Sequence, residues 1–239
     1  MPQNPQSNRT HHRPVTFSTE VFDRYPGGSD PQTTAQAAHY SAHALLQQGR
    51  KNTDPNITQK LVHFTDTFGL ETLAEMWSQA PALSLPGALW RIYLIRDTVH
   101  THTTQIAHYY ARGMEQNWRS SLIAGVADPP TEQEVAETTN TILTGAYTGD
   151  FDIALERFAA FCAVIATGQR ATAHTIVSGK NSPTPPHQTT LQYQLRPSAE
   201  VQTEARRRAE QLHAKTQQLL TISQDLEQAA QLWRAGTLE

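Results

Sequence analysis

Residues 151–168, FDIALERFAAFCAVIATG, form the stretch that decides the fold of this chain. Their apolar side chains cover nearly every face of a helix, and Gly149 and Asp150 precede them as a helix-start signal. A helix that is apolar on all sides is stable only when other elements bury it. We therefore expect this segment to form the centre of a helical core and to end at Gly168.

The same pattern recurs in ALWRIYLI, residues 88–95, where only Arg91 interrupts the apolar surface. Two such segments can bury their apolar faces against each other. We expect helices over 87–100 and 151–167 to form the core pair. The side chains expected to be buried in mutual contact are Leu89, Trp90, Tyr93, Leu94, Leu155, Phe158 and Ile165.

Helix-start signals recur along the 239 residues of the chain. Asp-Pro pairs stand at 30–31 and 54–55, and Thr131 with Glu134 matches a capping box. No run of residues favours a sheet, so we expect an all-α fold, a compact multi-helix bundle. Glycines are expected to end several helices, at Gly49, Gly69, Gly113 and Gly168.

The distribution of proline, glycine and polar residues divides the chain into four regions. We expect a disordered tail over 1–29, a helical core domain over 30–168, a Pro/Thr-rich linker over 169–197 and a long C-terminal helix over 198–236. The N-terminal tail is too polar to offset the entropy that ordering it would cost.

The long C-terminal helix carries one apolar seam with heptad spacing. Polar Thr216 and Ser223 interrupt this seam, so the coiled-coil pattern is partial. A helix with one apolar seam needs a surface to pack on. We expect it either to fold back on the bundle, the favoured outcome, or to bind a partner protein or a second copy. The candidate partner-binding residues are Leu212, Leu219, Leu226 and Trp233.

Charge argues against broad binding to nucleic acid. The chain has 19 Lys and Arg residues against 22 Asp and Glu residues, a net charge of −3. The run Arg206–Arg208 could contact phosphate, but Glu204 and Glu210 stand four residues from Arg208 and Arg206. This spacing is typical of ion pairs on a solvated helix face. Nucleic acid is therefore an unlikely partner by sequence.

The sequence also narrows the expected location of the chain. Its apolar stretches are too short to cross a bilayer, so no membrane association is expected, and the expected location is cytoplasmic. The single cysteine, Cys162, rules out an intrachain disulfide. It stands among apolar residues with no neighbouring cation, so we expect a buried, unreactive thiol.

Two sets of residues are candidates for a binding site. His39 and His43 are four apart on one helix, a spacing that lets two imidazoles share a metal ion, although no zinc-protease motif accompanies them. Arg91 and Arg96 lie on an apolar helix and could form an anion pocket with nearby histidines. The alternative is that each arginine reaches solvent or pairs with a carboxylate.

Four segments of the chain resemble a family of helical actinobacterial proteins, in which they recur in the same order. Where those proteins tend to have an Arg-rich stretch after the first core helix, this chain has His100, His102 and His108. The resemblance implies a helical fold and brings no activity with it. The segments are LPGALWRIYLIRD (85–97), GVADPPT (125–131), GDFDIALERFAAFCAVIATGQR (149–170) and LWRAGTLE (232–239).

Two hypotheses about function follow. No nucleophile elbow, dinucleotide fingerprint or other catalytic constellation is present in the sequence, and no cofactor is expected. The first hypothesis is a non-enzymatic protein-interaction or regulatory module that uses its long C-terminal helix. The alternative is a small-molecule or metal-binding protein that uses Arg91, Arg96 and nearby histidines.

Overall fold

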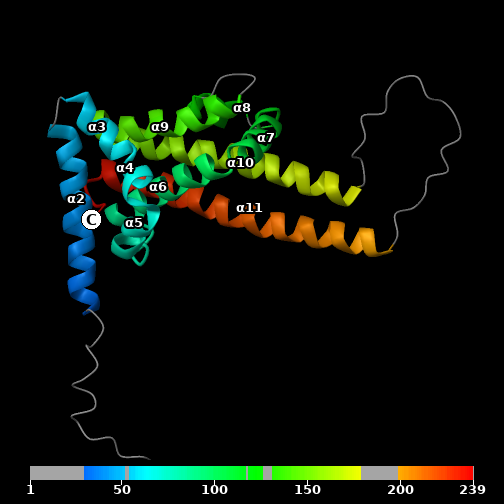
Figure 1. Ribbon diagram of the computed structural model, residues 1–239, viewed down its shortest axis with the longest axis horizontal. Coiled ribbons are helices and arrows are strands. Elements are labelled where there is room, and N and C mark those ends of the chain that lie inside the picture. The colour runs from blue at the N-terminus through cyan, green and yellow to red at the C-terminus, as the bar shows by residue number, and fades with distance from the viewer. Residues whose placement is uncertain (1–29, 52–53, 117, 126–130, 179–198, 239) are drawn as a thin grey trace, which may run out of the picture.

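The computed structural model describes residues 30–51, 54–116, 118–125, 131–178 and 199–238. These residues form helices and no strand, which confirms the predicted all-α class (Figure 1). The predicted tail over 1–29 lies outside the described residues. The helices are α2 (Pro31–Lys51), α3 (Pro55–Val62), α4 (Phe64–Phe68), α5 (Leu70–Trp77), α6 (Leu85–Thr101), α7 (Thr103–Met114), α8 (Trp118–Ala124), α9 (Glu132–Thr148), α10 (Phe151–Ser178) and α11 (Ala199–Arg234).

Helix starts follow the predicted capping signals. The Asp54 carboxylate accepts a hydrogen bond from the Asn56 backbone N–H at 2.9 Å, at the start of α3. Thr131 and Glu134 form the complete capping box of α9, because each side chain accepts a hydrogen bond from the other residue's backbone N–H. These bonds satisfy N–H groups that a helix start leaves without an intrahelical partner.

The apolar segment that opens α10 lies at the centre of the molecule. Its side chains from Phe158 to Phe161 are almost wholly buried, and α11, α7, α8 and α9 pack around it. This packing explains why a helix apolar on all faces is stable here. None of the described helices is both long enough and apolar enough to cross a membrane.

The long C-terminal helix α11 folds back along α10, and the two run side by side in Figure 1. Leu226, Ala229 and Ala230 of α11 are fully buried in this contact. Ser223 and Thr216, which interrupt the seam in the sequence, are also buried. Ser223 Oγ donates a hydrogen bond to the Ala159 carbonyl of α10 at 2.8 Å. Small hydroxyl side chains therefore allow the two helices to approach closely.

The last turn of α11 is fixed at the start of α10. Phe151 meets the half-buried Trp233 edge to face, with ring centroids 5.0 Å apart. Arg234 forms ion pairs with Asp152 at 2.5 Å and with Glu156 at 2.7 Å. The guanidinium of Arg50, at the end of α2, lies over the Trp233 ring. The C-terminal residues thus join α2 to α10.

The expected core pair of helices is present, but the two helices are not each other's main neighbours. Helix α6 packs chiefly on α2, α9 and α5, and it only touches α10. Trp90 and Leu94 are accordingly half-buried, at the edge of the core. The other five predicted core residues are buried, because each helix meets different partners around its circumference.

One predicted helix end is confirmed to within one residue, and another is an interior position. Helix α7 ends at Met114, next to Gly113, whereas α10 continues past Gly168 to Ser178, so residues 169–178 are helical rather than part of the predicted linker. The rest of that linker, over 179–197, lies outside the described residues. A Cβ on Gly113 would overlap the Val164 carbonyl, and one on Gly168 would overlap the Tyr109 carbonyl. Both glycines allow close approach of α7 and α10, and Gly168 does so from the interior of its helix.

Candidate functional site

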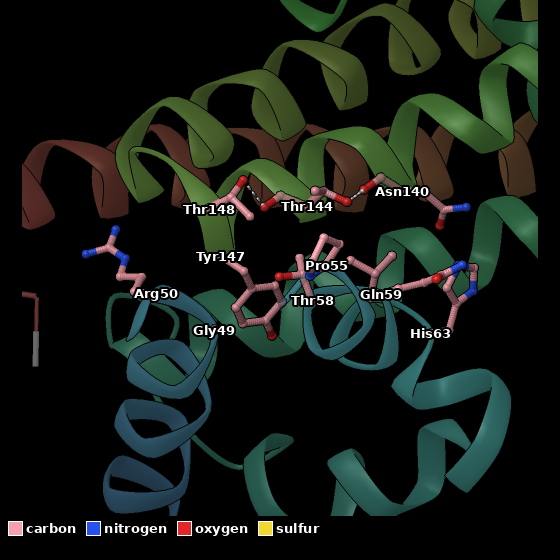
Figure 2. Close-up of a pocket in the computed structure, with 11 residues that line it drawn as sticks. Gly49, Arg50, Pro55, Thr58, Gln59, His63, Asn140, Thr144, Tyr147 and Thr148 are labelled. Carbon is pink, nitrogen blue, oxygen red and sulfur yellow. Dashed lines mark hydrogen bonds between the residues drawn. The ribbon is translucent and has the colours of Figure 1, made fainter. Parts of the chain in front are cut away.

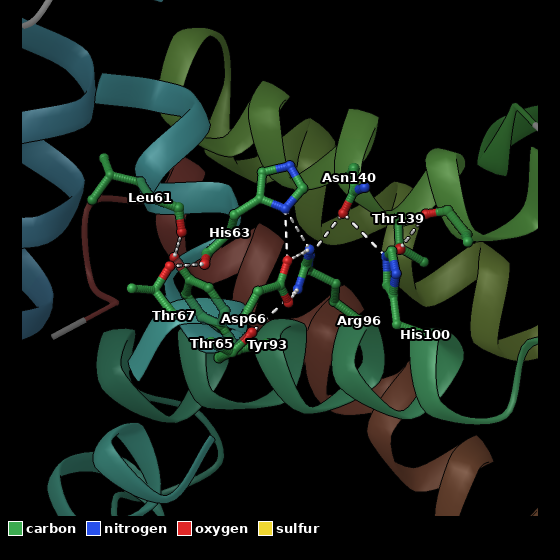
Figure 3. A network of polar contacts seen from close by, with 11 residues as sticks. Leu61, His63, Thr65, Asp66, Thr67, Tyr93, Arg96, His100, Thr139 and Asn140 are labelled. Carbon is green, nitrogen blue, oxygen red and sulfur yellow. Dashed lines mark hydrogen bonds and ion pairs between the residues drawn. The ribbon is translucent and has the colours of Figure 1, made fainter. Parts of the chain in front are cut away.

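The site begins at a helix break that the sequence did not reveal. The segment 54–69 has the pattern of one helix, but it forms α3 and α4, separated at His63. The backbone of His63 has φ −94° and ψ 20°, outside the helical region. The break turns His63 and Asp66 toward Arg96 of α6 (Figure 3).

Arg96 is a fully buried arginine whose guanidinium is held on every side. It forms a bidentate pair with Asp66, with Nη1–Oδ1 at 2.7 Å and Nη2–Oδ2 at 2.8 Å. Nη1 also donates to Thr65 Oγ1 at 3.2 Å, and Nε donates to Asn140 Oδ1 at 2.7 Å. Since a buried charge is costly unless paired and hydrogen-bonded, this set of partners is what keeps Arg96 inside.

Asp66 holds both Arg96 and His63. The hydrogen bonds from Arg96 have the largest effect on the pKa of Asp66, and the hydrogen bond from His63 acts in the same direction. Together they outweigh the opposing effect of partial burial and lower this pKa to about 2. A carboxylate can only accept, so the 2.7 Å contact between His63 Nδ1 and Asp66 Oδ2 requires a proton on Nδ1. In a neutral ring, Nε2 of His63 is then an acceptor.

Asn140 of α9 is oriented by the same network. Its Oδ1 accepts from Arg96 and lies 3.2 Å from His100 Nε2. Arg96 can only donate, so the oxygen of the amide must face it and the amide nitrogen faces elsewhere. That nitrogen has no hydrogen-bond partner in the described part of the chain. Burial, and then the charge of Arg96, lower the pKa of His100, which favours its neutral form.

His63 and Asn140 form one end of a pocket between α2, α3 and α9, and Arg50 lies at the other end (Figure 2). We call it the α2–α3–α9 pocket. Its volume is about 620 Å³, within the range of small-molecule sites. The lining residues are Gly49, Arg50, Pro55, Thr58, Gln59, Val62, His63, Asn140, Thr144, Tyr147 and Thr148.

A pair of tyrosines supports the wall of this pocket. Tyr93 OH is 2.6 Å from the Leu61 carbonyl, to which it donates, and 2.6 Å from Tyr147 OH. Tyr147 therefore donates to Tyr93, and both hydroxyls are satisfied. Burial raises the pKa of both hydroxyls, so they remain protonated. These groups fix the wall and leave ligand contacts to other residues.

The charged side chains of the pocket lining favour a negatively charged ligand. None of the lining residues is acidic, whereas Arg50 is cationic and Asn140 offers N–H donors. Thr144 and Thr148 donate their hydroxyl protons to carbonyls four residues earlier, and their oxygens can still accept hydrogen bonds. The pocket therefore suits a small anionic molecule that also carries hydroxyl groups.

The two predicted anion-binding arginines do not form a common pocket. Arg96 takes part in the network behind the α2–α3–α9 pocket, whereas Arg91 donates to Asp225 of α11 at 3.2 Å and to the Gly87 carbonyl at 3.0 Å. Each guanidinium thus has a carboxylate partner within the chain. The sequence did not identify Asp66 or Asp225 as these partners.

The predicted metal ligands lie on α2, outside this site. His43 is exposed, and His39 borders a separate pocket beside Met76 and Pro81. Within the described residues, no group of three or more His, Cys, Asp and Glu side chains is arranged to hold a metal ion. His39 and His43 therefore have no third ligand of these types in the described part of the chain.

The predicted partner-binding seam packs against the chain's own helices. Leu212 and Leu226 are buried, and Leu219 and Trp233 are half-buried against the core. In the basic run, Arg207 and Arg208 both pair with Glu204. Arg206 forms no ion pair with the described residues, so the Arg206–Glu210 pair that the sequence suggested is not made.

Sequence reasoning missed His63, Asp66 and Asn140. The i, i+3 spacing of His63 and Asp66 was the available signal, but on a continuous helix it would indicate only a surface pair. No protein-family model, curated protein or solved structure matches this chain.

Proposed function

We propose that this protein binds a small anionic molecule in the α2–α3–α9 pocket, without performing chemistry on it. The observation that carries the proposal is the Asn140 amide. Arg96 donates to the oxygen of this amide, which leaves the two N–H donors of the amide available to a ligand. Asn140 lines a pocket that has no acidic lining residue. Arg50 supplies positive charge at the opposite end.

The buried ion pair supports this proposal through preorganisation. Arg96 is joined to α4 and α9 by hydrogen bonds, so the pocket wall keeps its shape before a ligand arrives. A donor that is already fixed loses little conformational entropy on binding, which strengthens binding. The hydrogen bonds to the anion are charge-assisted and therefore stronger than those between neutral groups.

Asn140→Asp tests the proposal with almost no change in shape. The new carboxylate still accepts from Arg96 and His100, but it replaces the N–H donors with a negatively charged oxygen. We expect calorimetry with phosphorylated and carboxylated metabolites to detect a ligand, and Asn140→Asp to weaken its binding by about 100-fold. The melting temperature without ligand should change little.

Arg50→Gln and Lys51→Gln form a matched pair at the end of α2. Both remove one positive charge, but only Arg50 lines the pocket. We expect Arg50→Gln to weaken anion binding and Lys51→Gln to leave it unchanged. Anion binding that is equally strong in wild type and Asn140→Asp would show that the pocket is not the site.

A second candidate function, recognition of a partner protein, is favoured by the distal arm, defined as residues 170–178 of α10 and 199–213 of α11. The ends of these helices extend past the rest of the bundle in Figure 1. Val177 and Val201 are 58% and 57% exposed there. Arg170 and Arg206 have no ion-pair partner among the described residues and border a shallow groove of about 480 Å³.

Two arginines, Arg170 and Arg206, line this groove against one carboxylate, Glu210. The excess of positive charge and the apolar floor suit an acidic segment with apolar residues. Affinity capture with the full chain tests the idea. A partner should be retained by wild type and by Lys60→Glu, a charge reversal on α3, and lost with Arg206→Glu. A partner retained equally by all three would show that the arm does not bind it.

A further inference from the structure

Another pocket lies where α11 passes the corner between α6 and α7. It has a volume of about 340 Å³ and draws its lining from α6, α7, α10 and α11. His102 lies at the corner itself, between the two helices. We call this the α7–α11 pocket. It shares no lining residue with the α2–α3–α9 pocket.

The back of the α7–α11 pocket contains a largely buried glutamine whose amide nitrogen has no partner in the described chain. Gln169 is only 6% exposed, and its one partner within the described residues is Thr216, with Oγ1 3.2 Å from Oε1. The single hydroxyl proton of Thr216 faces two acceptors, Gln169 Oε1 and the Leu212 carbonyl oxygen 2.8 Å away. Thr216 therefore serves only the oxygen side of the amide, and the N–H groups of Gln169 have no partner in the described chain.

Among the described residues, the Gln169 nitrogen is not one of the side-chain atoms that are both closed off from water and without a partner, so water or a ligand can reach it. Gln169 reaches accessible space, because its side chain lines the α7–α11 pocket. The structure thus places hydrogen-bond donors at the back of a pocket rather than against an apolar wall. This is the arrangement that a bound polar group satisfies.

The charged residues around the pocket indicate which charge the polar group of a ligand should carry. His102, Arg208 and Lys215 line it, and no lining residue is acidic. Glu204 already pairs with Arg208 at 2.7 Å, whereas Lys215 forms no ion pair with the described residues. An ammonium and an amide N–H in the lining of one pocket, neither with a partner in the described chain, favour an oxyanion, because both groups can donate to it.

Apolar side chains complete the lining and indicate what accompanies the oxyanion. Ile106 of α7, Ile176 of α10 and Leu212 of α11 contribute to the wall. An apolar ligand portion gains free energy by covering such surface. A free inorganic ion would leave that surface in water.

We propose that the α7–α11 pocket binds a small amphipathic oxyanion, a carboxylate or phosphate ester with a short apolar portion, through Gln169 and Lys215. The head group lies between the amide and the ammonium, and the apolar portion contacts Ile106 and Ile176. This site is independent of the function proposed for the α2–α3–α9 pocket.

Hexanoate and hexylamine, which have the same chain length and opposite charge, serve as probes on the full protein. We expect hexanoate to shift the methyl NMR signals of Ile106 and Ile176 in a saturable way, and hexylamine not to do so. Phenyl phosphate is the second anionic probe and separates a preference for phosphate from one for carboxylate. Inorganic phosphate should bind more weakly than either, since it has no apolar portion.

Three variants localise the binding. Lys215→Gln and Gln169→Met should each weaken hexanoate by about tenfold, because each removes one donor to the anion. Lys60→Gln, an equal charge change on α3, should have no effect, and neither should Asn140→Asp. Lys215 is exposed, so its variant folds even if Gln169→Met does not.

Failure of this site is distinguishable from failure of the other pocket. The proposal is overturned if neither hexanoate nor phenyl phosphate shifts these methyl signals, if hexylamine shifts them equally, or if Lys215→Gln behaves like Lys60→Gln. Loss of anion binding in Asn140→Asp with hexanoate binding retained would support both proposals separately.

Discussion

At the scale of single residues, the partners of the buried ion pair differ in exposure. Arg96 is fully buried, whereas the Asp66 side chain is 47% exposed. Removing Asp66 leaves an unpaired charge inside the protein, which costs about 3–5 kcal/mol. Removing Arg96 leaves a carboxylate that water can reach. We therefore expect Asp66→Ala to lower the free energy of unfolding more than Arg96→Met, in urea titrations at pH 7; the reverse order would contradict this account.

The same carboxylate makes stability depend on pH in the acid range. The pKa of Asp66 falls from 3.8 to about 2 on folding, chiefly through the hydrogen bonds from Arg96. A lowered pKa means that the unfolded chain binds more protons between these values, so the stabilisation is complete above pH 3.8 and is lost as pH falls toward 2. The difference in unfolding free energy between wild type and Asp66→Asn should be constant from pH 5 to 7 and shrink below pH 4, in ~0.15 M salt. A difference that grows on acidification would disprove this assignment.

The sequence identified Arg96, one of the two partners in the buried ion pair. The position of Arg96 on an apolar helix predicted a buried or functional arginine, and the structure places it in the network. Its partner Asp66 could not be predicted, because it lies thirty residues earlier in the chain and depends on the break at His63. A local pattern reports which face a residue occupies, but not which distant element meets that face.

At the scale of helices, the crossing of α7 and α10 depends on glycine. We expect Gly168→Ala to lower the free energy of unfolding by about 2 kcal/mol or more, because the new methyl group would overlap the Tyr109 carbonyl, which is backbone and cannot rotate away. Gly145→Ala is the matched control, since no atom lies within 4 Å of its Cβ position on α9. That variant should gain about 0.5–1 kcal/mol from helix propensity in the same denaturant titration. Equal effects would argue against a close contact at Gly168.

The same glycines show why element boundaries were less predictable than element type. Helical periodicity and the capping residues Asp54, Thr131 and Glu134 gave correct helix starts. Glycine is frequent both after a helix end and at a close helix crossing, so Gly168 alone does not distinguish the two. Only the neighbouring α7 decides between them, and it is a tertiary feature.

At the scale of the whole molecule, Trp233 connects the end of α11 to two other helices. It packs on Phe151 of α10 and lies beneath Arg50, which also lines the α2–α3–α9 pocket. We expect Trp233→Ala to lower the melting temperature of the entire protein in one transition, with a loss of about 2 kcal/mol for this half-buried side chain. Calorimetry distinguishes this loss of stability of the whole protein from local fraying at the end of α11, in which the melting temperature would be unchanged. Trp233→Phe should recover part of the loss.

Position 223 separates the two possible uses of the long C-terminal helix. In a dimeric coiled coil, an apolar residue at this heptad position would strengthen association, so Ser223→Leu would raise the melting temperature and double the mass. In the folded-back structure, Ser223 is 4% exposed and its hydroxyl contacts the Ala159 carbonyl, so leucine has no room. We therefore expect Ser223→Leu to cost about 1–3 kcal/mol by overpacking. Thermal unfolding and light scattering on one sample decide between the two arrangements. A dimeric coiled coil would give a higher melting temperature and twice the mass, whereas the folded-back chain would give a lower melting temperature and an unchanged mass.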